Sequence, residues 1–263
     1  MVADCPCVRP ATHAGSWYCS DSAELAADLS RWLTAVPQPE PELQAAPRAI
    51  IGPHAGFAYS GPIAASAYQR VKPEGIKRVF VLGPSHHVFL RSCATTAATS
   101  YETPFGELPV DVEITKALNS SGQFKVMSPE TDGAEHSIEL HLPFVAHCFR
   151  GHAITIVPIM VGALTPALEA RFGELMAPYL DDADNFFVIS SDFCHWGTRF
   201  DYVRYDKMAG DVSASIEALD REGMACIERQ DAAAFTAYLE ATKNTICGRH
   251  SIGILLHAMR FAR

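Results

Sequence analysis

The stretch Arg78-Val79-Phe80-Val81-Leu82-Gly83 indicates the fold class more clearly than any other part of the chain. Its side chains are mostly branched or aromatic and do not alternate with polar ones, which is the pattern of a strand covered on both faces. Three other short runs share this pattern: residues 48–52, 153–161 and 185–190. We therefore predict that these four runs form the central sheet of the protein.

Helical patterns lie between and after these runs. Apolar side chains recur at the spacing of one helix face in eight segments: 21–36, 62–71, 111–120, 137–149, 166–180, 207–222, 231–241 and 249–261. Strands that alternate with helices predict an α/β fold, with a mostly parallel or mixed sheet between helical layers. Residues 88–110 predict an edge hairpin, and residues 37–47, which contain four prolines, predict a loop.

The composition is that of a folded globular protein. The chain has 263 residues, of which 48% are hydrophobic and 19% are charged, so we expect a single domain with a substantial core. The formal net charge is -9, and no stripe of basic residues is present. Because nucleic acids and anionic membrane surfaces attract clustered Lys and Arg, neither is an expected partner.

Export and membrane insertion are not expected either. The first ten residues contain no apolar segment of the kind found in signal peptides, and the longest apolar run, residues 154–164, is too short to span a bilayer. The eight cysteines follow no framework spacing, which favours reduced thiols in the cytoplasm. Cys5-Pro-Cys7 could bind a metal, but we interpret it as part of a frayed N-terminus.

Polar clusters with histidine follow three of the four predicted strands. These clusters are Pro53-His54-Ala55-Gly56, Pro84-Ser85-His86-His87 and Ser191-Asp192-Phe193-Cys194-His195-Trp196. In open α/β sheets the carboxyl ends of the strands form the crevice in which ligands bind. We therefore expect these clusters to converge on one cleft.

His54 and His86 are candidate metal ligands in that cleft. Two neutral imidazoles and one anionic ligand suit a mid-series divalent ion. The third ligand is either Asp192 or Cys247, which lies in a polar turn at the start of the last predicted helix. A helix N-terminus and the nearby Arg249 would lower the pKa of this thiol and favour a thiolate. The alternative is that the histidines are structural and the thiol is inert and buried.

Asp192 and His195 form a candidate catalytic pair. A carboxylate beside an imidazole fixes its tautomer and raises its basicity, as a general base requires. The alternative is that Asp192 only caps a helix. The cluster Glu135-His136-Ser137-Ile138-Glu139-Leu140-His141 does not place both histidines on one helix face, so we interpret it as support for the site or as a cleft wall. Trp17 and Tyr18 are expected in the core.

Several common catalytic motifs are absent from the sequence. Residues 56–61 have the glycine spacing of a phosphate loop, but Pro62 and Ile63 stand where Lys and Ser or Thr would follow. The chain contains no G-x-S-x-G, H-E-x-x-H or G-x-G-x-x-G motif. These absences disfavour a serine hydrolase, a zinc protease of that type and a dinucleotide-binding enzyme.

The sequence resembles the Memo family, named after a mediator of ErbB2-driven cell motility. The resemblance rests on seven segments in order along nearly the whole chain: HAGSWY at 13–18, PHAG at 53–56, GPSHHV at 83–88, EHSIELHLP at 135–143, PIMVGA at 158–163, SSDFCHWG at 190–197 and NTICGRH at 244–250. It implies a fold similar to that of the class III extradiol dioxygenases, which bind non-haem iron through two histidines and a glutamate.

The resemblance also implies roles for individual residues. It implies metal ligands at His54, His86 and Cys247, a cleft carboxylate at Asp192 and a catalytic base at His195. The implied metal is Fe(II) or copper, with zinc as an alternative. Phosphotyrosine peptides of receptors are the implied partners, and the location is cytoplasmic, with the nucleus as an additional one.

These observations leave three functions open. The first is a mononuclear metal oxidoreductase acting on an unidentified small molecule. The second is a non-catalytic signalling adaptor that binds peptides in the same cleft, and the third is a metal-dependent hydrolase. Members of the family usually continue beyond the last helix into further strands, whereas this chain stops at Arg263. We therefore expect one domain over residues 1–263 that lacks those strands, with an open sheet edge or a thinly covered cleft.

Overall fold

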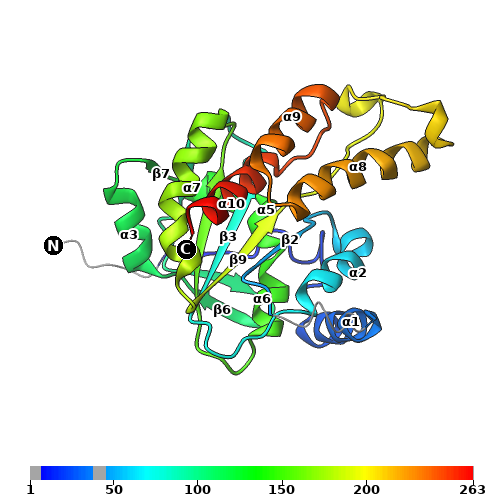
Figure 1. Ribbon diagram of the computed structural model, residues 1–263. Coiled ribbons are helices and arrows are strands. Elements are labelled where there is room, and N and C mark those ends of the chain that lie inside the picture. The colour runs from blue at the N-terminus through cyan, green and yellow to red at the C-terminus, as the bar shows by residue number, and fades with distance from the viewer. Residues whose placement is uncertain (1–6, 38–45, 263) are drawn as a thin grey trace.

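The computed structural model describes residues 7–37 and 46–262. Cys5 and most of the loop predicted at 37–47 lie outside these residues. The described chain forms one α/β domain in which a mixed, mostly parallel sheet is flanked by helices (Figure 1).

The central sheet has six strands in the order β2-β9-β3-β8-β4-β7. Their bounds are Ala49–Gly52 for β2, Asn185–Ser190 for β9, Arg78–Pro84 for β3, Thr155–Val161 for β8, Cys93–Thr95 for β4 and Phe124–Val126 for β7. The four predicted strands are neighbours and all run parallel, whereas β4 runs antiparallel to β8. The carboxyl ends of β2, β9, β3 and β8 therefore lie at one edge of the sheet.

Each face of the sheet carries its own hydrophobic core, because successive side chains of a strand point to opposite faces. In β3, Val79 and Val81 pack into one core, and Phe80 and Leu82 pack into the other. All six residues of β9 are buried. This double burial explains why the strands read as continuous apolar runs.

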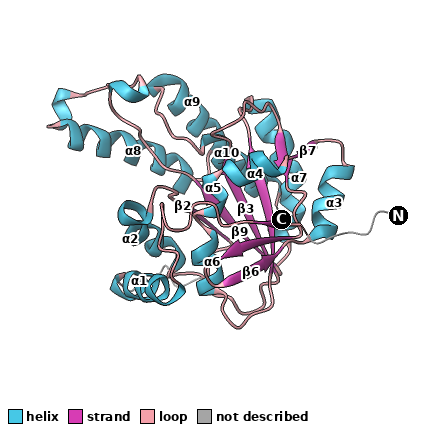
Figure 2. Cartoon of the chain, turned by 180° about the vertical axis from the view of Figure 1, so that it is seen from behind, coloured by secondary structure: helices cyan, strands magenta, loops and turns pink. Residues whose placement is uncertain are grey.

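Helices cover both faces, as Figures 1 and 2 show from opposite sides. The core on one face includes side chains from α1 (Ser22–Ala35), α2 (Phe57–Tyr68) and α6 (Leu142–Cys148). The core on the other includes side chains from α3 (Val112–Ser120), α7 (Pro166–Asp181), α8 (Val212–Glu228), α9 (Ala232–Thr242) and α10 (Arg249–Phe261). Asp21 caps α1 by accepting from the N–H groups of Ala23 and Glu24.

The structure corrects several predicted elements. The helix predicted at 137–149 is two helices, α5 (His136–Glu139) and α6, because Pro143 lacks the N–H that would continue the hydrogen bonds of the first. Only part of residues 88–110 forms the predicted hairpin. It consists of β5 (Ser100–Thr103) and β6 (Gly106–Pro109), which join β1 (Val8–Arg9) in a separate sheet, whereas β4 enters the main one.

Other elements begin at different residues or were not predicted. Helix α2 begins five residues early, at Phe57, and α8 begins only at Val212, where Asp211 caps it. Before it come the short 3-10 helices η2 (Thr198–Phe200) and η3 (Lys207–Ala209). Strands β1 and β7 and helix α4 (Pro129–Ala134) are too short to leave a periodic pattern. No helix within residues 7–37 and 46–262 is long and apolar enough to cross a membrane.

Candidate metal centre

His54 follows β2 and is almost completely buried, with 1% of its surface exposed. Its Nδ1 lies 2.6 Å from Oγ of Ser190, at the end of β9. The Ser190 hydroxyl donates its hydrogen to the carbonyl oxygen of Ser137, at 2.6 Å, so it accepts from the imidazole. The Nδ1 of His54 therefore carries the hydrogen, and Nε2 keeps its lone pair. Burial, followed by neighbouring imidazoles such as His86, lowers the pKa of His54 and keeps the ring neutral.

His86 follows β3 and is held by a carboxylate. Its backbone N–H and its Nδ1 donate to the two oxygens of Glu135, at 2.7 and 2.9 Å. Burial alone would raise the pKa of Glu135, but the hydrogen bonds and charge of His86 outweigh burial and lower it to about 2. An ionised carboxylate only accepts hydrogen bonds, so Nδ1 of His86 carries a hydrogen and Nε2 is available to a metal.

Cys247 immediately precedes Gly248, the N-cap of α10. Gly248 packs directly on the end of β9, where an added Cβ would collide with the carbonyl oxygen of Ser190 and the side chain of Ser191. This close approach brings Cys247 to the carboxyl edge of the sheet. Its Sγ accepts the N–H of Asp192, at 3.2 Å, and lies 3.2 Å from Nε2 of His54.

The structure brings His54, His86 and Cys247 together. One donor atom from each side chain lies within 4.8 Å of the other two. Donor atoms that share a tetrahedral metal lie about 3.3–3.8 Å apart, given metal–ligand bonds of about 2.0–2.3 Å. A small inward movement of the side chains would therefore accommodate one ion. Two imidazoles that each have a lone pair on Nε2, together with one sulfur, make a donor set that fits a divalent or soft metal.

The predicted thiolate is wrong for the metal-free protein. Burial, followed by the Asp192 carboxylate, raises the pKa of Cys247 to about 12. The N-terminus of α10 does not offset this rise in pKa. The guanidinium of Arg249 donates to the carbonyl oxygen of Ile246 and not to the sulfur. Cys247 is therefore a thiol at neutral pH, and a metal ion that binds it must displace its proton.

Asp192 lies between His54 and Cys247. Its Oδ1 accepts the backbone N–H of His54, at 2.9 Å, and its Oδ2 lies 3.8 Å from Nε2 of the same residue. No helix begins at residues 193–197, so the interpretation of Asp192 as a helix cap is wrong. Asp192, His195 and Cys247 form a second group with donor atoms within 4.8 Å of one another. Asp192 therefore remains near enough to serve as a fourth ligand or to accept a proton.

His195 is held differently from the prediction. Its Nδ1 donates to the carbonyl oxygen of Thr245, at 2.9 Å, and its backbone N–H donates to Oγ1 of Thr245, at 2.7 Å. The expected tautomer partner, Asp192, instead binds the backbone of His54. Because a carbonyl oxygen only accepts, Nδ1 of His195 carries a hydrogen and the neutral ring has a free Nε2. His195 is thus oriented for proton transfer by the backbone of residue 245.

Comparison with known proteins identifies the family to which the chain belongs. The family model described as "Memo-like protein" matches residues 9–263. The chain belongs to the Memo-like protein family.

Relatives from vertebrates and a nematode share this family. The chain is 49% identical over 252 residues to "Protein MEMO1" of Xenopus laevis and 48% identical over 253 residues to "Protein MEMO1" of Homo sapiens. Both alignments cover 95% of this chain and 84% of the relative. "Protein memo-1 homolog" of Caenorhabditis elegans is 43% identical over 256 residues, which cover 97% of this chain and 72% of the relative.

Aromatic side chains form a wall beside the donor cluster in this Memo-like chain. His136 stacks on His86 with ring centroids 4.5 Å apart, and Trp17 lies against His136 at the same distance. Trp17 is 38% exposed, so its predicted place in the core is wrong, whereas Tyr18 is buried as predicted. The two hydrogen bonds that Glu135 accepts from His86 confirm the prediction that the cluster at 135–141 supports the site.

Three residues of the site had no place in the sequence predictions. Ser190 and Thr245 orient His54 and His195, and His13 contacts the aromatic wall. Each lies inside a quoted family segment, but only the fold shows which nitrogen of which histidine it faces. The segments that meet here are 50 to 136 residues apart in sequence.

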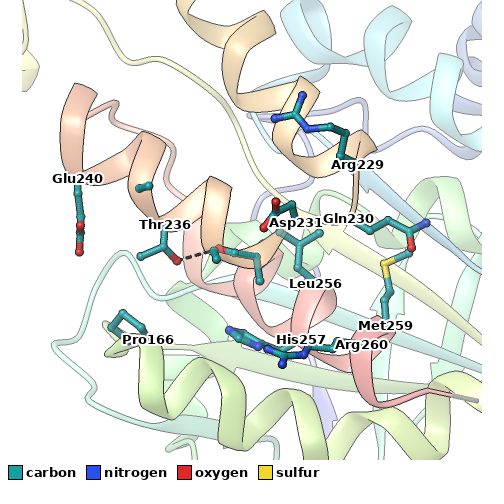
Figure 3. A pocket seen from close by; sticks show the side chains of 13 residues that line it. Pro166, Arg229, Gln230, Asp231, Thr236, Glu240, Leu256, His257, Met259 and Arg260 are labelled. Atoms are coloured by element: carbon teal, nitrogen blue, oxygen red, sulfur yellow. Dashed lines mark hydrogen bonds between the residues drawn. The ribbon is translucent and has the colours of Figure 1, made fainter.

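A separate cavity of about 760 Å³ lies between α9 and α10 (Figure 3). Its lining includes Arg229, Asp231, Thr236, His257 and Arg260, and none of the strand-end histidines. The donor cluster of this Memo-like chain is therefore distinct from that hollow.

Proposed function

We propose that this Memo-like protein binds a single Fe(II) or copper ion through His54, His86 and Cys247 and uses it in redox chemistry on a small molecule. The observation that supports this most strongly is the mutual distance of the three donor atoms, within 4.8 Å. The Nδ1 hydrogen bonds leave both Nε2 atoms with a lone pair, and that of His54 faces the thiol of Cys247, whose proton a metal would displace. Zinc is the alternative metal, since it accepts the same ligands.

The sulfur ligand favours a soft or borderline metal. Thiolates select copper(I), zinc and iron over magnesium or calcium, and imidazoles suit the same group. A redox-active ion at this site would supply electron transfer to or from a bound molecule. The cleft would then resemble that of the class III extradiol dioxygenases, with a thiolate in place of their carboxylate ligand.

The protein's own residues would accept protons and exclude water from the metal. In the neutral ring of His195, Nε2 has the lone pair that could accept a proton, because Nδ1 donates to the carbonyl oxygen of Thr245. Asp192 lies within 4.8 Å of Cys247 and can receive the proton that the thiol loses. The buried surroundings of His54 keep water from that side of the site. The protein would act in the cytoplasm.

A second function is favoured by the exposed aromatic wall. Trp17 is 38% exposed beside His136, so the cleft also offers a surface for an aromatic side chain of a peptide. In this proposal the protein is an adaptor that binds phosphotyrosine peptides without turnover. A peptide complex whose affinity is the same with and without metal would favour the adaptor.

The test is elemental analysis of protein purified without added metal, together with measurement of oxygen consumption. We expect about one ion per chain, lost in the variants His54→Ala and Cys247→Ala. The matched control is Cys93→Ala, which removes a buried thiol of β4 outside the donor cluster and should retain the metal. Metal content that is unaffected by both site variants would overturn the proposed centre.

A further inference from the structure

The way Glu135 holds His86 occurs a second time, at Glu139. Glu139 accepts the backbone N–H of His13 with Oε1, at 2.8 Å, and Nδ1 of the same histidine with Oε2, at 2.7 Å. One carboxylate thus binds the main chain and the ring of a single histidine in both cases. In the first case the result is a free Nε2 at the candidate metal centre.

The tautomer of His13 follows from its surroundings. Burial alone would raise the pKa of Glu139, but hydrogen bonds from His13 and the charge of Arg9 outweigh it and lower it to about 2. The ionised carboxylate accepts from Nδ1, so in the neutral ring Nε2 has the lone pair. Nε2 of His13 has no hydrogen-bond partner among residues 7–37 and 46–262, although only 14% of the side chain is exposed.

Ring contacts connect His13 to the metal centre. The rings of His13 and His136 are 5.9 Å apart, and His136 lies 5.5 Å from His54 and 4.5 Å from His86. Trp17 packs edge-on against His13 at 5.8 Å and faces His136. His13 therefore lies beside the candidate metal centre, separated from the candidate ligands by one ring.

We propose that His13 contacts the substrate and accepts, at Nε2, a hydrogen bond from a hydroxyl or N–H group at the end of the molecule that lies away from the metal. The substrate class that fits is a small planar molecule, whose ring lies against the exposed part of Trp17, because both faces of His136 are covered by Trp17 and His86. This inference rests on the proposed metal centre, because the metal holds the other end of the molecule.

A purely structural role is the competing explanation. Glu139 also accepts from Tyr18, at 2.8 Å, and pairs with Arg9, so His13 could simply complete a buried polar network. The two roles use different nitrogens. A network needs only Nδ1 and the main-chain N–H, whereas substrate contact needs Nε2.

The variant His13→Asn separates these roles. The amide nitrogen of Asn can replace Nδ1 as a donor to Glu139, and the side chain offers nothing at the position of Nε2. His13→Gln is the complementary variant, because its longer side chain places an amide oxygen near the position of Nε2.

The probes are 3,4-dihydroxybenzyl alcohol and 4-ethylcatechol, which chelate a metal with the same two oxygens and differ in a terminal hydroxyl or methyl group. Binding is measured anaerobically from the visible spectrum of the cobalt-loaded protein. We expect the wild type to bind the hydroxyl-bearing probe about 3–10-fold more tightly, the range for one neutral hydrogen bond. His13→Asn should abolish this preference with unchanged cobalt content and melting temperature, and His13→Gln should partly restore it.

Each outcome separates the two proposals. No preference in the wild type, or a preference that His13→Asn retains, would overturn the role of His13. Failure of the wild type to bind cobalt through Cys247, seen as the absence of a sulfur-to-cobalt charge-transfer band, would instead overturn the proposed metal centre. If His13→Asn does not fold, the His13→Gln measurement decides. A preference that is reduced but still measurable in that variant supports the contact, and one that is unaltered or completely lost refutes it.

Discussion

The candidate site holds its histidines in two different ways. On the β2 and β9 side, neutral groups orient the rings: the hydroxyl of Ser190 for His54 and the carbonyl of Thr245 for His195. On the side of residues 135–139, ionised carboxylates orient His86 and His13. A carboxylate partner makes an imidazole a stronger donor to metals and a stronger base, whereas a neutral partner fixes the tautomer without adding charge. Judged by the groups that orient its rings, the site therefore combines a low-charge half, where the carboxylate of Asp192 accepts a backbone N–H and orients no ring, and an acidic half.

The largest effect should come from His195, on the low-charge half. Replacing His195 by Ala should lower the oxygen-consumption rate of the metal-loaded protein by about 10²–10⁴-fold, the usual contribution of a general base. The metal content should remain unchanged, because His195 is not one of the three proposed ligands. Loss of metal from this variant, measured by elemental analysis, would place His195 among the ligands instead.

The acidic half should make the fold sensitive to acid. The pKa of Glu139 is lowered to about 2 in the folded protein from an ordinary value of 4.5. A lowered pKa stabilises the fold above the unfolded-state value, and this stabilisation is lost as the pH falls from about 5 towards 2. The loss should reach about 3 kcal/mol of unfolding free energy.

Urea unfolding at a series of pH values measures this effect. The variant Glu139→Gln should be less stable than the wild type at pH 7, and its unfolding free energy should change less between pH 5 and 3. The matched control is Glu113→Gln, at an exposed position of α3, which should keep the wild-type slope. Equal slopes for wild type and Glu139→Gln would show that the carboxylate is not ionised in the fold.

Removing the charge of Glu135 tests whether the acidic half tunes the affinity for the metal. Glu135→Gln removes the charge behind His86 and should weaken metal binding about 10–100-fold, as loss of an outer partner of a histidine ligand commonly does. Competition with a chelator measures the affinity. Glu130→Gln, at an exposed carboxylate of α4, is the control. If both variants bind the metal equally well, the carboxylate does not tune the ligand.

The smallest effect is expected on the opposite side, from Ser190→Ala. This variant leaves Nδ1 of His54 without its acceptor, and we expect a destabilisation of about 1–3 kcal/mol, with metal affinity reduced less than in Glu135→Gln. Thermal unfolding and the same chelator competition give both values. A larger loss of affinity than in Glu135→Gln would reverse the comparison and make the neutral partner the more important one.

The sheet and the meeting of the strand ends could be predicted because both follow from local patterns. Continuous apolar runs predicted β3 and β9, and the polar residues after them predicted a cleft at the carboxyl edge. The partners of the histidines could not be predicted in this way. Ser190 and His54 are 136 residues apart, and only the register of β2 against β9 makes them neighbours.

The burial of Cys247 and Trp17 could not be predicted from the sequence either. Cys247 lies just before the N-cap of α10, a position that favours a thiolate, but burial raises its pKa instead. Trp17 has a large apolar side chain of the kind usually found in a core, yet its place beside His136 leaves it exposed. The phosphotyrosine partner, the native metal and the expected missing strands remain predictions.

Gly248 has a consequence for genetics. Its bare backbone lets α10 begin against the end of β9, and any side chain there would collide with Ser190 and Ser191. In a library that varies every position and selects for metal retention, substitutions at 248 should therefore be depleted as strongly as those at Cys247. Position 248 would then score as a ligand although it has no donor atom, because such a selection reports the position of the helix start as well as the chemistry of the side chain before it.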